Sequence, residues 1–130
     1  MKYGAKMIAE STLEAVENSY AERDYDVHFT IPEFTCLCPQ SNFPDFAVID
    51  IRYVPDGKLV ELKSLKLYIN RFRDQEMFHE VAVNRILDDL VALLQPRWME
   101  VVGDFNVRGN IKTVVTARPV APGYSRNGRG

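Results

Sequence analysis

The first regular pattern along the chain is an alternation of apolar and polar residues in the segment 26–38. A period of two residues predicts a strand with two different faces, and Pro32 predicts a bulge or an edge position within it. Residues 39–44 are rich in turn formers and are expected to form a loop. The apolar run at 45–54 predicts a second strand, and Pro55-Asp-Gly57 after it is typical of a tight hairpin turn.

The middle of the chain changes to a helical period. Apolar residues recur at spacings of three and four in two successive stripes: Leu62, Leu65, Ile69 and Phe72, then Phe78, Ala82, Ile86, Leu90 and Leu94. This spacing places each stripe on one side of a helix, and the second helix is expected to stop before Pro96. Two more strands are predicted at 98–106 and 111–117, joined through a turn at Gly109.

The predicted order of elements is therefore strand, strand, helix, helix, strand, strand. Two hairpins that flank a helix pair predict an α+β fold, with an antiparallel four-stranded sheet and both helices on one face. The other face and the two edge strands of such a small sheet stay open. We expect identical copies of the chain to close them in an oligomer.

The same pattern divides the chain into three parts. Residues 1–25 are polar and weakly patterned, and we expect a short helix or an arm there. Residues 26–118 are expected to form a single folded domain. The last part, residues 119–130, ends in a Gly- and Arg-rich stretch and is expected to be a mobile tail.

Length and composition agree with one globular domain. The chain has 130 residues, of which 46% are hydrophobic and 26% are charged. Its longest aliphatic run, at 90–94, is far shorter than the roughly 20 residues that a membrane helix needs. Two cysteines are too few for a disulfide scaffold or a four-cysteine zinc site, and the N-terminus shows no signal-peptide pattern. We therefore expect a reduced, cytoplasmic setting.

The net charge of −2 argues against a general nucleic-acid binder, which is usually strongly basic. The charges are nevertheless unevenly spread. Seven acids and one base lie between Glu10 and Glu33, and five bases but no acid follow Asp104. Such runs are most often solvated faces. The alternative is that a local basic patch binds a small anionic ligand or a neighbouring subunit.

One candidate for chemistry is the pair Cys38 and Asp45, on either side of the first predicted loop. If this loop folds back, the two side chains face each other across its mouth, and a thiol beside a carboxyl group suits a nucleophile and its proton donor. The alternative is structural, because free cysteines are often buried and an Asp before a strand is commonly a turn or capping residue.

Cys36 would lie on the same side of the strand as Cys38. A metal or redox role for the two thiols is the weaker interpretation, since His28 and His79 are the only imidazoles available.

Two further clusters suit a ligand with a purine-like base and phosphates. Glu80 follows His79 at the start of the second helix, where its carboxylate could accept two parallel N–H bonds from a guanine-like edge or merely complement the helix dipole. Lys63 at the start of the first helix and Arg108 in a distant loop suit a phosphate, although an exposed amphipathic helix is the simpler explanation of Lys63. The chain has no Gly-x-Gly-x-x-Gly, which excludes a Rossmann-type dinucleotide site.

The segment Glu61-Leu-Lys-Ser-Leu-Lys-Leu-Tyr68 resembles the signature of the NADPH-dependent 7-cyano-7-deazaguanine reductases, the nitrile reductases of the queuosine pathway (QueF type). All eight positions of this signature fit. Further segments resemble the same family and occur in its order: 33–39, 44–46, 71–74 and 78–80. The resemblance extends over residues 26–118 and fits the short, single-domain form.

The resemblance implies the tunnelling fold (T-fold), in which such sheets join side by side into an oligomeric barrel with active sites between subunits. It also implies the reduction of 7-cyano-7-deazaguanine by NADPH to 7-aminomethyl-7-deazaguanine, a step of queuosine (tRNA modification) biosynthesis. Cys38 would form a thioimide with the nitrile, and Asp45 would supply the proton. The base would be held by Val60, Glu61, Leu62, His79 and Glu80, and NADPH by Leu62, Lys63, Arg108 and Gly109. The resemblance implies no metal, while the short aliphatic runs and the net charge predict no membrane and no direct contact with nucleic acid.

Two other functions stay open at this point. A hydrolase of the same fold, such as a GTP cyclohydrolase, would need a zinc site of His and Cys, which two histidines 51 positions apart supply poorly. A non-catalytic purine-binding module would bind the base without turnover.

The chain also departs from relatives at three positions. Cys36 stands where many have Ser, and Val81 and Ala82 stand where some have a cysteine, so a protective disulfide from that place is excluded.

Overall fold

The structure, a computed structural model, describes residues 3–120. Its elements follow one another in this order: α1 (Tyr3–Glu10), β1 (Ala15–Glu17), β2 (Val27–Leu37), β3 (Pro44–Val54), β4 (Lys58–Val60), α2 (Leu62–Asn70), the 3-10 turn η1 (Arg71–Asp74), α3 (His79–Leu94), β5 (Trp98–Arg108) and β6 (Ile111–Ala117). The tail expected at 119–130 lies almost entirely outside the described residues. None of the described helices is long and apolar enough to cross a membrane.

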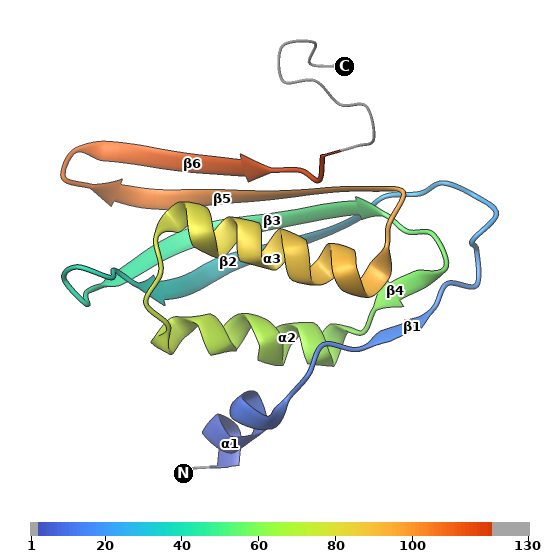
Figure 1. The fold of residues 1–130 in the computed structure, drawn as a ribbon, viewed down its shortest axis with the longest axis horizontal. Helices are drawn as coiled ribbons and strands as arrows, with labels where there is room; N and C mark the ends of the chain where they lie inside the picture. The colour runs from blue at the N-terminus through green and yellow to red at the C-terminus, as the bar shows by residue number, and fades with distance from the viewer. Residues whose placement is uncertain (1–2, 121–130) are drawn as a thin grey trace.

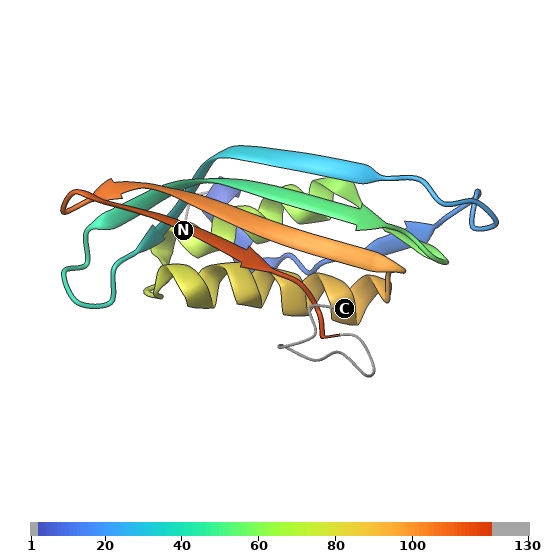
Figure 2. The ribbon, with the colours of Figure 1, turned by 90° about the horizontal axis from the view of Figure 1, so that it is seen from above.

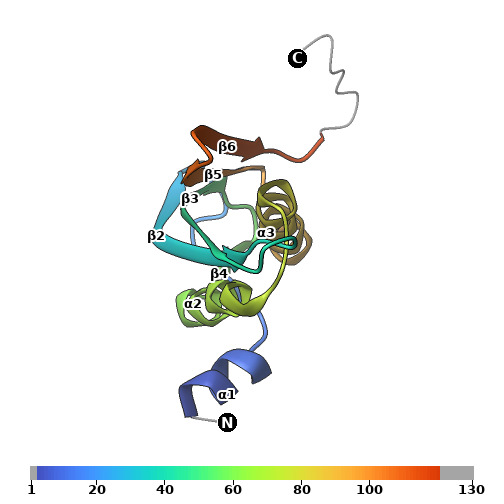
Figure 3. The ribbon, with the colours of Figure 1, turned by 90° about the vertical axis from the view of Figure 1, so that its left-hand side faces the viewer.

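The main sheet is antiparallel and has the strand order β2-β3-β5-β6. Helices α2 and α3 cover one of its faces, as Figures 1 and 2 show from two directions. In Figure 3, seen from one end of the sheet, α1 lies beyond α2 and away from the strands. The predicted α+β fold, with its antiparallel four-stranded sheet and two helices on one face, is confirmed.

The hydrophobic core lies between the sheet and α3. Alternate residues of β3 and β5 point into it, and Ile49, Ile51 and Val101 are fully buried there together with Val83 of α3. Gly103 allows the helix to approach β5 closely, because a Cβ at this position would stand 2.5 Å from Cγ2 of Val83. Such close packing holds the second turn of α3 in a fixed position over the middle of β5.

Two irregularities of the sheet lie where the sequence predicted breaks. The pairing of β2 with β3 shifts register between Ile31 and Phe34, around the bulge predicted at Pro32. At the β5–β6 turn, Gly109 has a φ of 56° and Asn110 a φ of 68°. Both values lie in the left-handed region that glycine and asparagine tolerate, so the predicted turn is confirmed.

The segment after β3 differs from the expected hairpin. β4 pairs with β1 in a separate two-stranded sheet, in which Val60 lies opposite Ala15. Both edges of β3 are occupied by β2 and β5, so β4 cannot pair back with β3. The hairpin predicted at Pro55-Asp-Gly57 is therefore wrong. The segment 1–25 holds β1 in addition to the helix α1, and the sequence did not predict this strand.

The two predicted helices differ from the structure only at their ends. The first ends at Asn70, and Phe72 lies in the 3-10 turn that follows. The second begins at His79, with Phe78 at the N-cap position. It ends where Gln95 takes a left-handed conformation with a φ of 45°, directly before Pro96, as the sequence predicted.

Candidate active site

Cys38 is the first residue of the loop that joins β2 to β3. Its N–H donates to the carbonyl of Phe43 at 2.9 Å, and its own carbonyl accepts from the N–H of Asn42, also at 2.9 Å. The loop therefore folds back on itself, which was the condition for Cys38 and Asp45 to come together. It lies at the left-hand end of the ribbon in Figure 1, with Cys38 partly exposed at its base.

The two thiols of the chain have opposite properties. Hydrogen bonds from the Ser41 side chain, and from the backbone at Ser41 and Gln40, hold the pKa of Cys38 below its ordinary value. Burial raises the pKa of Cys36 to about 11, with smaller effects of the charges on Asp45 and Cys38. The thiolate is the nucleophilic form of cysteine, so these two shifts favour Cys38 over Cys36 as a nucleophile.

Asp45 is the second residue of β3 and is buried, with 6% of its surface exposed. The residue opposite it in the sheet is Cys36, while Cys38 stands just beyond the last pair, Leu37 and Pro44. Cys38 and Asp45 were expected to face each other directly. They are not opposite each other in the sheet, because the strand pairing ends one residue before Cys38. The charge of Asp45 nevertheless acts on both thiols.

Two side chains from other elements meet the carboxylate of Asp45. Nη1 of Arg108, at the end of β5, donates to Oδ1 of Asp45 and, at 3.0 Å, to the carbonyl of Pro44. Nε2 of His79 lies 3.3 Å from Oδ2. The site therefore unites residues from β3, α3 and β5 around one buried carboxylate.

Phe105 orients His79 and was not among the predicted site residues. The two rings are stacked, with centroids 3.9 Å apart and planes inclined by only 7°. Phe105 itself is fully buried in the core. Alternation along β5 places Phe105 on the covered face, but no local pattern indicates that a histidine from another element stacks on it.

A second group of predicted site residues surrounds the start of α2. Val60 is buried, and its N–H donates to the hydroxyl of Tyr53 at 3.2 Å. The carboxylate of Glu61 accepts from the N–H groups of Lys63 at 2.9 Å and of Ser64 at 2.8 Å, which lowers its pKa and caps the helix. The side chains of Leu62 and Lys63 are exposed.

These two groups lie at opposite ends of the chain's long axis. Figures 1 and 2 show the 38–43 loop, the start of α3 and the β5–β6 turn at one end, and β4 with the start of α2 at the other. Lys63 and Arg108, both predicted to contact phosphates, are thus far apart. One copy of the chain brings together Cys38, Asp45, His79 and Arg108, but not the residues 60–63.

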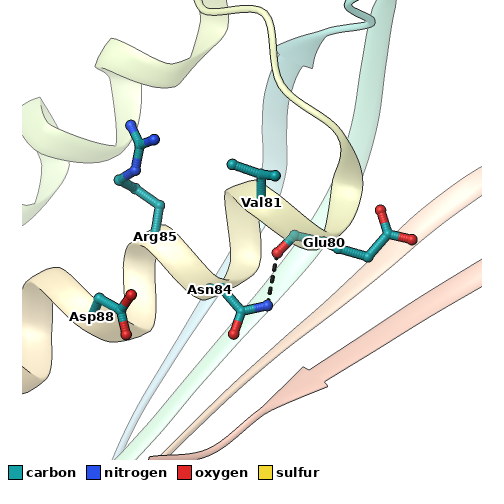
Figure 4. A pocket seen from close by; sticks show the side chains of 5 residues that line it. All are labelled: Glu80, Val81, Asn84, Arg85 and Asp88. Atoms are coloured by element: carbon teal, nitrogen blue, oxygen red, sulfur yellow. Dashed lines mark hydrogen bonds between the residues drawn. The ribbon is translucent and has the colours of Figure 1, made fainter.

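The exposed side of α3 carries a shallow hollow lined by Glu80, Val81, Asn84, Arg85 and Asp88. Figure 4 shows the carboxylate of Glu80 extending away from Arg85, while Asn84 donates to the Glu80 carbonyl at 2.8 Å. The Glu80 carboxylate is exposed in the first turn of the helix, so it is open to a ligand. Within residues 3–120, no group of three or more His, Cys, Asp or Glu side chains is arranged to hold a metal ion.

Comparison with known proteins gives one consistent result. A family model described as QueF-like protein matches residues 44–123. The NADPH-dependent 7-cyano-7-deazaguanine reductase of Aquifex aeolicus is 56% identical over 117 residues, which cover 90% of this chain and 91% of that protein. The protein of the same name from Microcystis aeruginosa is 55% identical over 115 residues, or 88% of each chain.

A solved structure supports the fold independently. The crystal structure of the archaeosine synthase QueF-Like in the apo form matches with a TM-score of 0.67, over 72% of this chain and 91% of that chain. Only 20% of the residues are identical, so this likeness concerns the fold alone.

Proposed function

The chain belongs to the family of NADPH-dependent 7-cyano-7-deazaguanine reductases, and we propose that it reduces the nitrile of this base through a covalent adduct on Cys38. The observation that carries the proposal is the setting of Cys38, a partly exposed thiol with a lowered pKa near the buried carboxyl group of Asp45. The product is the primary amine, 7-aminomethyl-7-deazaguanine. The reaction belongs to queuosine biosynthesis, which modifies tRNA.

The addition step needs no leaving group. The Cys38 sulfur forms a bond to the nitrile carbon, one π bond of the nitrile breaks, and the proton that the thiol gives up passes through Asp45 to the nitrogen, which gives a thioimide. His79, with Nε2 3.3 Å from Oδ2 of Asp45, can return a proton to that carboxylate. Reduction to the amine takes four electrons, which two molecules of NADPH, bound one after the other, would supply as one hydride each.

Exposed charged side chains provide the main proposed contacts with the substrate and the cofactor. The exposed carboxylate of Glu80 accepts two parallel N–H bonds from the guanine-like edge of the base, with His79 beside it. The exposed ammonium of Lys63 at the start of α2 and the half-exposed guanidinium of Arg108 fit the phosphates of NADPH. Val60, Glu61 and Leu62 contribute to the base site, and Leu62 and Gly109 to the cofactor site.

We propose an oligomer of the tunnelling fold, in which residues 60–63 of one subunit complete the site around Cys38 of its neighbour. Three features support it. The helices cover only one face of the sheet, β2 and β6 are edge strands, and the two groups of site residues lie at opposite ends of the chain. Side-by-side joining of the edge strands would bring such ends together.

The chemistry also favours a reducing compartment. Cys36 and Cys38 are both free thiols, and the nucleophile has to stay reduced to act. We therefore place the enzyme in the cytoplasm.

Intact mass spectrometry tests the covalent step without NADPH. Because the nitrile adds and nothing leaves, the mass of the protein should rise by the full mass of 7-cyano-7-deazaguanine. The Cys38→Ala variant should show no increase, while Cys36→Ala should react like the unmodified chain. An adduct that persists in Cys38→Ala would contradict the assignment of the nucleophile.

A further inference from the structure

We infer that Arg108 is a positioning residue for Asp45, and that it acts on the addition step before NADPH takes part. This inference rests on the proposed function, which assigns Arg108 only to the cofactor. A residue that serves the cofactor alone affects hydride transfer, whereas a residue that orients the proton donor affects thioimide formation in the absence of cofactor.

The strand pairing shows why Asp45 needs such support. The pairing of β3 with β5 ends at Ala47 and Phe105, two residues before Asp45 is reached. Beyond this point the side chain of Arg108 makes the link, because its Nη1 donates both to Oδ1 of Asp45 and to the carbonyl of Pro44. One nitrogen thus fixes the backbone at the start of β3 and the carboxylate that follows.

The exposed fractions of the Asp45 and Arg108 side chains agree with two roles for Arg108, which are support of Asp45 and contact with the cofactor. Only 7% of the Asp45 side chain is exposed, compared with 43% of the Arg108 side chain. The carboxylate is therefore held inside the site, while the remaining guanidinium nitrogens stay open to solvent or to a phosphate. A single arginine can accordingly support the proton donor and contact the cofactor in the same complex.

The charged and titratable groups that face Asp45 come from three directions. They are Arg108 from β5, His79 from α3, and Cys36 and Cys38 from β2 and the loop after it. Arg108 is the only permanent cation among them. Its removal would leave a buried carboxylate with His79 as its one ionic partner, and such a carboxylate turns toward water or toward the imidazole. The proton would then no longer be directed at the nitrile nitrogen.

The test measures the rate of thioimide formation on Cys38 at saturating nitrile and without NADPH. Arg108→Ala and Arg108→Gln should lower this rate by about 10²-fold, the lower end of what a positioned acid contributes. Arg108→Lys should recover part of the loss, because an ammonium can also donate to Asp45. The nitrile concentration that gives half the maximal rate should change little.

Lys112→Ala is the matched control. Lys112 is a cation beside the same turn, paired with Asp104 instead of Asp45. Its variant should form the adduct at the unmodified rate, and thermal unfolding should show that all variants are folded. Unchanged rates in Arg108→Ala and Arg108→Gln, or an equal loss in Lys112→Ala, would overturn the inference alone. Failure of the unmodified chain to form any adduct would overturn the proposed function and the inference together.

Discussion

The ring of His79 lies flat on the ring of Phe105, and this stack directs Nε2 toward Asp45 at 3.3 Å. Phe105 comes from the core side of β5 and is fully buried. The orientation of a group at the reacting end of the site is therefore set by the packing of the hydrophobic core. Replacement of Phe105 should consequently affect proton transfer as well as stability.

Phe105→Leu should separate these two effects. Leucine keeps most of the apolar volume but removes the flat surface under His79, so thioimide formation should slow several-fold while stability falls by about 1–3 kcal/mol. Phe34→Leu is the control, since Phe34 packs edge-on against Phe105 in the same core with centroids 6.5 Å apart. It should cost similar stability without slowing the adduct. Equal slowing in both variants would show that the slower thioimide formation follows from lost stability, and it would contradict the role of the stack.

Ser41→Ala should change the pH dependence of Cys38. The Ser41 side chain is the largest cause that lowers the pKa of this thiol, so its removal should raise the pKa. At neutral pH the thiolate fraction then falls, and alkylation of Cys38 by iodoacetamide should become slower, with the midpoint of the rate profile shifted to higher pH. Thr12→Ala, at an exposed position outside the site, should leave the profile unchanged. An unshifted midpoint in Ser41→Ala would contradict the assigned cause.

Mixing of variants tests the shared site. Cys38→Ala removes the proposed nucleophile at one end of the chain, and Lys63→Glu opposes the proposed phosphate contact at the other end. Hybrid oligomers of the two should regain part of the activity, because one interface can combine an intact Cys38 with an intact Lys63. Cys38→Ala mixed with Asp45→Asn should regain none, since both changes affect the same end. Equal results for the two mixtures would contradict a site built between subunits.

Much of the fold follows from periodicity in the sequence. Alternation predicted β2, and the apolar run at 45–54 predicted β3. Two strands joined through a turn at Gly109 were expected where β5 and β6 lie, and spacings of three and four predicted α2 and α3. The small sheet of β1 and β4 was missed because its strands have three residues each, and they pair across more than 40 positions of chain. Short strands of this kind carry no period that a local pattern can reveal.

The sequence indicated which residues are candidates for the site, but it did not indicate which of them contact one another. Spacing, charge and the resemblance to the family pointed to Cys38, Asp45 and Arg108. That Asp45 lies opposite Cys36 depends on the register after the bulge in β2, and the ion pair of Asp45 with Arg108 joins residues 63 positions apart. Such contacts arise only when the whole sheet is assembled.

The reaction proposed for this chain is the reduction of a nitrile to an amine through Cys38. The most direct measurement is the amount of NADPH oxidised, followed by its absorbance, for a known and limiting amount of 7-cyano-7-deazaguanine. The unmodified chain should oxidise two NADPH per nitrile, and the rate should be lowered by about 10³-fold or more in Cys38→Ala. Rapid NADPH oxidation by Cys38→Ala, or one NADPH per nitrile, would contradict the proposed reaction.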